Sequence, residues 1–267
     1  MKNNRLILLI TVVLLTGILG FICWAKTRYI VPILTYHHVG QCANPVLRLN
    51  TVSTETFERQ MAFLKKHGYK VIDFDDLVQG IKEGARFAPN TVVIHFDDGY
   101  EDNYINAFPI LKKYQFPAMV FLVSDAIGTP GFMSWEQVED LERYDFLAGA
   151  HTRTHQHLPD LSVEKAREEI QGSKRIIESK LGHRVDYFVY PSGGFNDQVK
   201  SIVAEAGYKA AATTNRGRDR LNRDVFELNR IRMKDSDQGF VLWAKLSGYY
   251  NLFRQPKTIS KEDMILK

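Results

Sequence analysis

Short apolar runs alternate with amphipathic stretches along most of the chain, a pattern typical of strands that are each followed by a helix. The predicted strands lie at 31–36, 91–96, 117–123, 146–150, 186–191, 209–214 and 225–233, with a weaker one at 69–72. Most of these runs are continuously apolar, as expected of strands that are covered on both faces. The alternation predicts a parallel sheet, and the strand count favours a closed barrel over a doubly wound sheet.

The predicted helices lie between these strands, at 54–67, 74–83, 101–114, 134–144, 162–181, 196–206 and 237–250. In the first of them, Phe57, Met61 and Leu64 stand at i, i+4 and i+7 and form one apolar stripe. Ser134 followed by Gln137 predicts a capping box, and Pro109 predicts a break within the third helix. No Pro/Gly/Ser-rich linker divides the chain, so we expect a single domain over residues 29–267.

The N-terminal segment has a different composition from the rest. Residues 6–25 form an uninterrupted run of 20 apolar or small residues without a charge. A helix of that length spans the roughly 30 Å of a bilayer's hydrocarbon core, whereas the apolar stretch of a signal peptide has only about 7–15 residues. We therefore expect residues 1–28 to be a cytoplasmic tail and a transmembrane helix, with cleavage and secretion as the alternative. The following domain would then lie outside the cytoplasm.

Charge and cysteine content narrow the function classes. The 267 residues carry a formal net charge of +4, from 35 Lys and Arg against 31 Asp and Glu. Four of the basic residues, Lys2, Arg5, Lys26 and Arg28, lie in the first 28 residues, where there is no acid, so the remainder is formally neutral. A nucleic-acid-binding surface is therefore not expected. Cys23 and Cys42 are too few for a disulfide framework. We also expect the protein to be a monomer.

Polar motifs come directly after several of the predicted strands. They are Tyr36-His37-His38, Asp97-Asp98-Gly99, the segment from His151 to His155, and Tyr190-Pro191 with the glycines that follow. The carboxyl ends of parallel strands in a barrel open on one face, where active sites are built. We therefore expect these distant segments to converge.

The histidine pair suggests a metal site. His151 and His155 can bind one cation if their segment turns helically, although a surface loop that happens to hold histidines is the alternative. Asp97 or Asp98 is the expected source of a third ligand. Two imidazoles and one carboxylate leave positions open for water and substrate, as in catalytic zinc sites. The other carboxylate can then accept a proton from the attacking water.

Over roughly residues 30–235, the chain resembles the polysaccharide deacetylase family, carbohydrate esterase family 4, also called the NodB-homology domain. The family's Thr-Phe-Asp-Asp-Gly motif reads His95 to Gly99 here, and its His-Ser/Thr-x-x-His motif reads His151 to His155. The resemblance implies a deformed (β/α)7 barrel that hydrolyses N-acetyl groups. By position, it implies that Asp97 is the general base and that Asp98, His151 and His155 hold the metal, with Zn²⁺ expected and Co²⁺ or Ni²⁺ suited to the same ligands.

The groove wall of the family is matched more loosely. Tyr190-Pro191 resembles it, which implies that the Tyr190 backbone N–H helps to bind the oxyanion. The family's usual arginine before this proline is absent. Arg230, or else Arg232, is our candidate to orient Asp97 instead. Trp135, together with Phe132 and Met133, is a candidate sugar-stacking edge, and packing of Trp135 in the core is the alternative.

The general acid departs from the family pattern, because the chain has no histidine after His183 and the family usually takes this residue from near the C-terminus. Tyr36-His37 is similar to the branch of biofilm poly-β-1,6-N-acetylglucosamine deacetylases, in which an early strand supplies the histidine. His37 is therefore the expected acid. We expect His38 to face outward or to support the loop, and His95 to support the site or lie in the core.

The sequence thus predicts a membrane-anchored, metal-dependent enzyme that releases acetate from an N-acetylglucosamine polymer at the cell surface. Poly-β-1,6-N-acetylglucosamine and peptidoglycan are the expected substrates. Two alternatives stay open: an O-acetyl polysaccharide esterase that uses the same machinery, and a carbohydrate-binding or adhesion protein that keeps the barrel without turnover.

Overall fold

Most strands of the structure form one parallel sheet. The computed structural model describes residues 2–41, 45–144, 146–214 and 217–251. The main strands are β1 (Ile33–Tyr36), β4 (Lys70–Val71), β5 (Thr91–Phe96), β6 (Ala118–Leu122), β7 (Phe146–Ala150), β8 (Tyr187–Val189), β9 (Ala210–Thr213), β10 (Leu228–Asn229) and β11 (Ile231–Arg232). A separate short pair joins β2 (His38–Val39) to β3 (Thr51–Val52), also in parallel.

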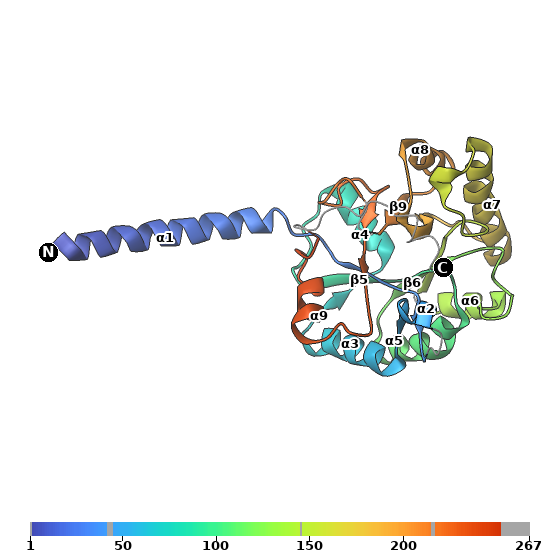
Figure 1. The fold of residues 1–267 in the computed structure, drawn as a ribbon, viewed down its shortest axis with the longest axis horizontal. Coiled ribbons are helices and arrows are strands. Elements are labelled where there is room, and N and C mark those ends of the chain that lie inside the picture. The colour runs from blue at the N-terminus through green and yellow to red at the C-terminus, as the bar shows by residue number, and fades with distance from the viewer. Residues whose placement is uncertain (1, 42–44, 145, 215–216, 252–267) are drawn as a thin grey trace.

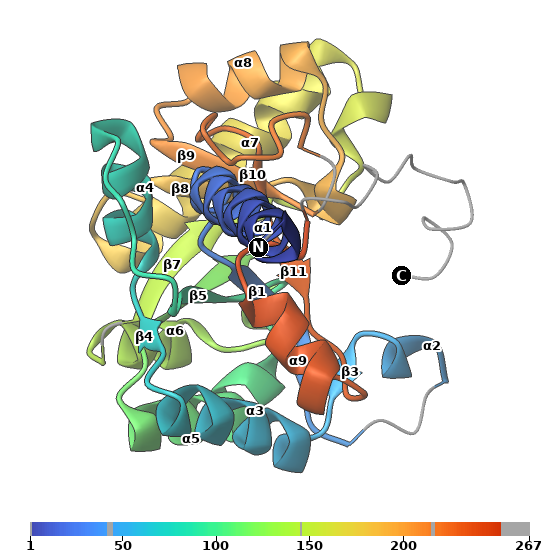
Figure 2. The ribbon, with the colours of Figure 1, turned by 90° about the vertical axis from the view of Figure 1, so that its left-hand side faces the viewer.

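The sheet is curled into a nearly closed barrel. Its order is β10-β9-β8-β7-β6-β5-β1-β11, and β4 pairs with β5. The strands β10 and β11 stand at opposite ends of this order, yet only Arg230 separates them in the chain, so the two edges of the sheet approach each other (Figure 2). The prediction of an α/β barrel of parallel strands is confirmed.

Helices surround the barrel, as Figures 1 and 2 show. They are α2 (Pro45–Arg48), α3 (Thr54–Lys66), α4 (Phe74–Glu83), the π-helix η1 (Asn103–Ala107), α5 (Phe108–Tyr114), α6 (Trp135–Glu142), α7 (Val163–Leu181), α8 (Asp197–Glu205) and α9 (Gly239–Leu246), with 3-10 turns η2 (Leu158–Asp160) and η3 (Pro191–Gly193). The capping box at Ser134 and Gln137 is present. The predicted break near Pro109 is also present, as the passage from η1 to α5.

Alternate residues of the strands pack on different sides of the sheet, because successive side chains of a strand point to opposite faces. On one side, Ile94 and Phe96 of β5 pack in a large core with residues of α3, α5, α7 and α8. On the other side, Val93 packs in a second core that includes Phe74 of α4. All six residues of β5 are buried. Asp97 continues the series of Val93 and His95, which directs it to the side of the second core.

One prediction about the elements needs correction, and another stays a prediction. The predicted strand 225–233 is divided into β10 and β11, because the chain turns at Arg230 from one edge of the sheet to the other. The helix expected over residues 6–25 exists as α1 (Lys2–Lys26), which extends away from the barrel in Figure 1. Among the described residues, however, no helix has the combined length and apolar character that a bilayer crossing requires. The transmembrane anchor stays a prediction.

Candidate active site

The predicted site residues come together at the carboxyl end of the barrel strands. His37 follows β1, Asp97 and Asp98 follow β5, and His151 follows β7. Arg230 stands between β10 and β11. Because every strand pairing is parallel, these positions share one end of the barrel.

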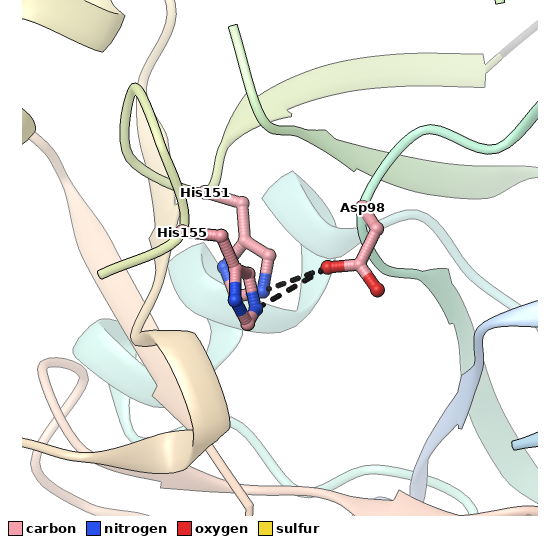
Figure 3. Close-up of side chains that lie close together, drawn as sticks. All are labelled: Asp98, His151 and His155. Carbon is pink, nitrogen blue, oxygen red and sulfur yellow. Dashed lines mark ion pairs between the residues drawn. The ribbon is translucent and has the colours of Figure 1, made fainter. Parts of the chain in front are cut away.

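Asp98, His151 and His155 form a compact cluster in which both imidazoles face one carboxylate (Figure 3). The Nε2 atoms of His151 and His155 each lie 3.4 Å from Asp98 Oδ1. Zinc bonds of about 2.0–2.1 Å at tetrahedral angles would separate two ligand atoms by about 3.3–3.4 Å. The cluster therefore has the donor types and the spacing that a divalent cation requires.

A hydrogen bond to the backbone fixes the orientation of His151. Its Nδ1 lies 2.7 Å from the Val189 carbonyl oxygen at the end of β8. A carbonyl only accepts, so Nδ1 carries the proton and, in the neutral ring, Nε2 keeps its lone pair toward Asp98. Metal-binding histidines are commonly oriented by such a partner.

The cluster is assembled by strained turns and not by a helix. Asp98, Thr152 and His155 have φ angles of 74°, 66° and 60°, in the left-handed region that residues other than glycine seldom adopt. The His155 N–H donates to Thr152 Oγ1 at 3.0 Å and closes the turn between the two histidines. The two rings thus converge through a non-helical turn of residues 151–155. Strain of this kind is typical of functional sites.

Asp97 is held by a two-point contact with Arg230. The Arg230 guanidinium donates from Nη1 to Asp97 Oδ1 at 2.6 Å and from Nη2 to Oδ2 at 2.8 Å, while its Nε donates to the Thr213 carbonyl at 2.9 Å. Burial alone would raise the pKa of Asp97, but the Arg230 charge, with a contribution from His151, holds this pKa well below its usual range. Asp97 is therefore a carboxylate at neutral pH. Arg232 instead contacts Leu49 and Asn50.

His37 lies beside Asp97, with 3.9 Å between its Nε2 and Asp97 Oδ2. Its side chain is 11% exposed. The His38 ring forms a hydrogen bond with Asp102 and does not face Asp97, so His38 supports the loop as expected. His95 lies fully buried between the rings of Phe74 and Phe121, and burial lowers its pKa well below the usual value. His95 is thus a neutral core residue.

The predicted role of the Tyr190 backbone is wrong. The Tyr190 N–H donates to the Ala212 carbonyl at 3.1 Å in the β8–β9 ladder, and the Tyr190 ring is fully buried. Pro191 has no N–H, so the next backbone donor along the loop is that of Ser192. Ser192 has a φ of 54°, again in the left-handed region. The donor that the sequence assigned to Tyr190 is therefore already bound within the sheet.

A cavity of about 430 Å³ lies beside the candidate ligands Asp98 and His155. Trp135 is not part of its lining and packs against the large core, with the Lys180 ammonium 5.9 Å from its ring centre. The predicted sugar-stacking role of Trp135 is therefore not supported, whereas Phe132 does line the cavity.

Tyr100 was missed by the sequence analysis and lies in the wall of this cavity. Its ring stacks on His38, with centroids 3.6 Å apart, and on Phe132, with centroids 5.1 Å apart. Burial, followed by the charge of Asp98 and a hydrogen bond with it, raises the pKa of the Tyr100 hydroxyl. The one sequence signal for a place of Tyr100 in the cavity wall is its position two residues after Asp98.

Comparison with known proteins gives a consistent result. Residues 84–211 match the family model described as polysaccharide deacetylase. The chain is 28% identical to YxkH of Bacillus subtilis (strain 168) over 223 residues, which are 83% of this chain and 78% of that protein. It is also 28% identical to a poly-beta-1,6-N-acetyl-D-glucosamine N-deacetylase of Staphylococcus aureus (strain MSSA476), over 69% of this chain and 68% of that protein.

Solved structures of similar fold include the Streptococcus pyogenes deacetylase PplD in complex with acetate. It superposes with a TM-score of 0.75 at 27% identity, over 81% of this chain and 97% of that one. The fold is also shared with IcaB from Ammonifex degensii, with a TM-score of 0.71 at 20% identity, over 84% of this chain and 97% of that one.

Proposed function

The chain belongs to the polysaccharide deacetylase family and is a hydrolase, and from this we propose that it removes N-acetyl groups from an N-acetylglucosamine polymer and releases acetate. The observation that carries the proposal is the arrangement of Asp97 and His37 beside the cluster of Asp98, His151 and His155. It supplies a base, an acid and a cation site at one end of the barrel.

In the proposed reaction, Asp98, His151 and His155 hold a divalent cation, for which we propose zinc. A cation bound there would polarise the acetyl carbonyl and lower the pKa of the attacking water. The donor set suits cobalt or nickel as well.

Asp97 serves as the general base in this proposal. It is ionised at neutral pH, because Arg230 keeps its pKa low, and Arg230 also fixes the direction of both carboxylate oxygens. Asp97 accepts the proton of water as the oxygen attacks the acetyl carbon. Negative charge then develops on the acetyl oxygen. We propose the Ser192 N–H as its backbone donor, because Ser192 is the first residue after Tyr190 whose N–H is not bonded in the β8–β9 ladder.

His37 serves as the general acid. When the carbon–nitrogen bond breaks, the sugar nitrogen has to take up a proton, because an amide anion is too basic to leave. The distance of 3.9 Å between His37 Nε2 and Asp97 Oδ2 supports this proposed role. The products are acetate and a free amine, which carries positive charge at neutral pH and changes the polymer's adhesion to anionic surfaces.

We further propose poly-β-1,6-N-acetylglucosamine as the substrate. The S. aureus relative is named for N-deacetylation of this polymer, and the acid of this chain comes from an early strand, as in the resemblance described above. A peptidoglycan substrate is the competing choice. The cell-surface location and the monomeric state expected from the sequence stay predictions.

The test is acetate release by the purified chain from poly-β-1,6-N-acetylglucosamine, peptidoglycan and chitin oligomers, with acetylated xylan as an O-acetyl substrate. The proposal expects release from the first and little from xylan. Preferential release from xylan would favour an O-acetyl esterase, and no release from any polymer by metal-loaded protein would favour a binding protein.

A further inference from the structure

Side chains at the start of η1 form hydrogen bonds with the chain segment that carries His37. The segment from Asp102 to Asn106 follows the Asp97-Asp98-Gly99 motif and lies beside residues 37–39. Part of it forms the π-helix η1, an uncommon helix type that is frequent at functional sites. The proposed base and the side chains that bind the segment of the proposed acid thus belong to one short stretch of chain.

These side-chain contacts begin where the sheet hydrogen bonds between β1 and β5 end. The last of them is donated by the Asp97 N–H to the Tyr36 carbonyl at 3.0 Å. Beyond this point, the backbone groups of residues 37–39 need other partners, because buried backbone groups are nearly always hydrogen-bonded.

The His38 N–H donates to the Asn50 carbonyl at 3.2 Å, and side chains from the η1 region supply further partners. Asn103 Nδ2 donates to the His37 carbonyl at 2.6 Å, and Asn106 Nδ2 donates to the Val39 carbonyl at 2.7 Å. The Val39 N–H donates to Asp102 Oδ1 at 3.3 Å. Asn103 is 4% exposed, so water has little access to its side-chain amide.

The same segment also fixes His38. The Nδ1 atom of His38 lies 2.7 Å from Asp102 Oδ2, and its ring stacks on Tyr100 with an interplanar angle of 21°. Successive side chains of an extended segment point to opposite sides. Pinning His38 toward Asp102 therefore directs His37 the other way, toward Asp97.

We propose that Asn103 and Asp102 are positioning residues for His37, which set the place of its imidazole relative to Asp97 without touching the substrate. The proposal rests on the proposed function, because it concerns the acid of that reaction. Proton transfer requires the donor within hydrogen-bond reach of the leaving nitrogen. A backbone shift at residue 37 would weaken this step more than any other.

The experiment compares two substrates that differ in their need for an acid. Hydrolysis of an N-acetylglucosamine oligomer requires protonation of the departing nitrogen, whereas 4-nitrophenyl acetate releases 4-nitrophenolate, which leaves without a proton. For the Asn103→Ala variant of the full chain, loaded with zinc, we expect kcat on the oligomer to fall roughly 10- to 100-fold. Hydrolysis of the aryl ester should stay within about threefold of wild type.

Asn90→Ala is the matched control, because the Asn90 amide also donates to a backbone carbonyl, that of Gly68, before β5 begins. It should leave both activities unchanged. Asp102→Asn keeps the volume of the side chain and removes its charge, and we expect it to show the same selective loss as Asn103→Ala. If Asn103→Ala does not fold, the two substrates are compared with Asp102→Asn instead.

Equal losses on both substrates in folded, metal-loaded variants would overturn the inference, since they would indicate a general disturbance of the site. Unchanged oligomer hydrolysis would overturn it as well. If wild type hydrolyses the ester and releases no acetate from any N-acetylglucosamine oligomer, the proposed function itself fails, and this outcome is distinct from either of the others.

Discussion

The ion pair of Asp97 with Arg230 and that of Asp237 with Lys245 are about equally buried, but their surroundings differ. The side chains of the first pair are 4% and 2% exposed, and those of the second are both 4% exposed. Asp237 lies beneath α9, where its Oδ2 accepts from the Lys234 N–H at 2.7 Å and from Lys245 at 2.5 Å. Lys245 also donates to the Arg232 carbonyl at 2.7 Å.

Asp97, by contrast, has the ionisable imidazole of His37 and the candidate metal ligand Asp98 as neighbours. The hydrogen bonds given above join Asp237 and Lys245 to each other and to backbone groups, whereas the pair at the barrel mouth lies among groups that exchange protons in the proposed reaction. Burial of a charge is therefore not a sign of catalysis by itself. The groups that surround the charge separate a structural ion pair from a catalytic one.

The largest expected effect is that of Asp97→Asn. An amide cannot accept the proton of water, so acetate release should fall by about 10³-fold or more. Metal content should stay at the wild-type level, because Asp98, His151 and His155 are intact. Asp237→Asn makes the same change at the other pair and should leave kcat/KM within about threefold. Equal activity losses in the two variants would contradict the assignment of one pair as catalytic and the other as structural.

Lys245→Met sharpens the comparison from the structural side. It leaves the Asp237 carboxylate buried without its cation, which should lower the free energy of unfolding by about 3 kcal/mol. Urea denaturation measures this change, and kcat/KM on the folded protein should not change. Adding Asp237→Asn should recover most of the lost stability. A loss of turnover without a loss of stability would contradict the structural role.

Arg230→Lys should affect the pH dependence of activity. Lysine keeps the charge but loses the two-point contact, so the pKa of Asp97 should rise from its lowered value. Activity requires the Asp97 carboxylate, and the acid limb of the kcat/KM profile should therefore move to higher pH. We expect kcat at neutral pH to fall roughly 10- to 50-fold, through loss of orientation. An unmoved acid limb would argue against Arg230 as the residue that controls Asp97.

The smallest expected effect concerns a surface pair far from both regions in sequence. The Glu142 carboxylate, 2.8 Å from His183 Nε2, raises the pKa of His183 above its ordinary value of 6.5. The stabilisation is therefore fully present below that value and is lost as the pH rises through the higher folded pKa. Since His183 is half exposed, His183→Gln should change the unfolding free energy by only a few tenths of a kcal/mol. Melting curves at about pH 5.5 and about pH 9 should differ from wild type only at the lower pH.

The pattern of apolar runs was sufficient to predict the parallel barrel and most of its elements. Its failure at 225–233 has a topological cause, because the apolar pattern continues through Arg230 while the chain passes from one edge of the barrel to the other. The approach of Asp98 to His151 and His155 was predictable, since residues at the ends of parallel strands converge.

Other features of the site depend on distant partners that the sequence does not reveal. The Tyr190 N–H is occupied because β9 places Ala212 opposite it, 22 residues later. The role of Asn103 depends on the place where the β1–β5 ladder ends. Trp135 packs against the large core, with Lys180 of α7 near its ring. Local patterns predict elements, but they do not predict which donor remains available after the elements have packed.

Whether Asp98, His151 and His155 hold a catalytic cation can be measured by metal titration of the purified chain after removal of metal with a chelator. We expect that one equivalent of zinc restores acetate release from the N-acetylglucosamine oligomer, and that Asp98→Ala neither retains the ion nor recovers activity. Full acetate release by the metal-free protein, or wild-type zinc retention by Asp98→Ala, would contradict this expectation.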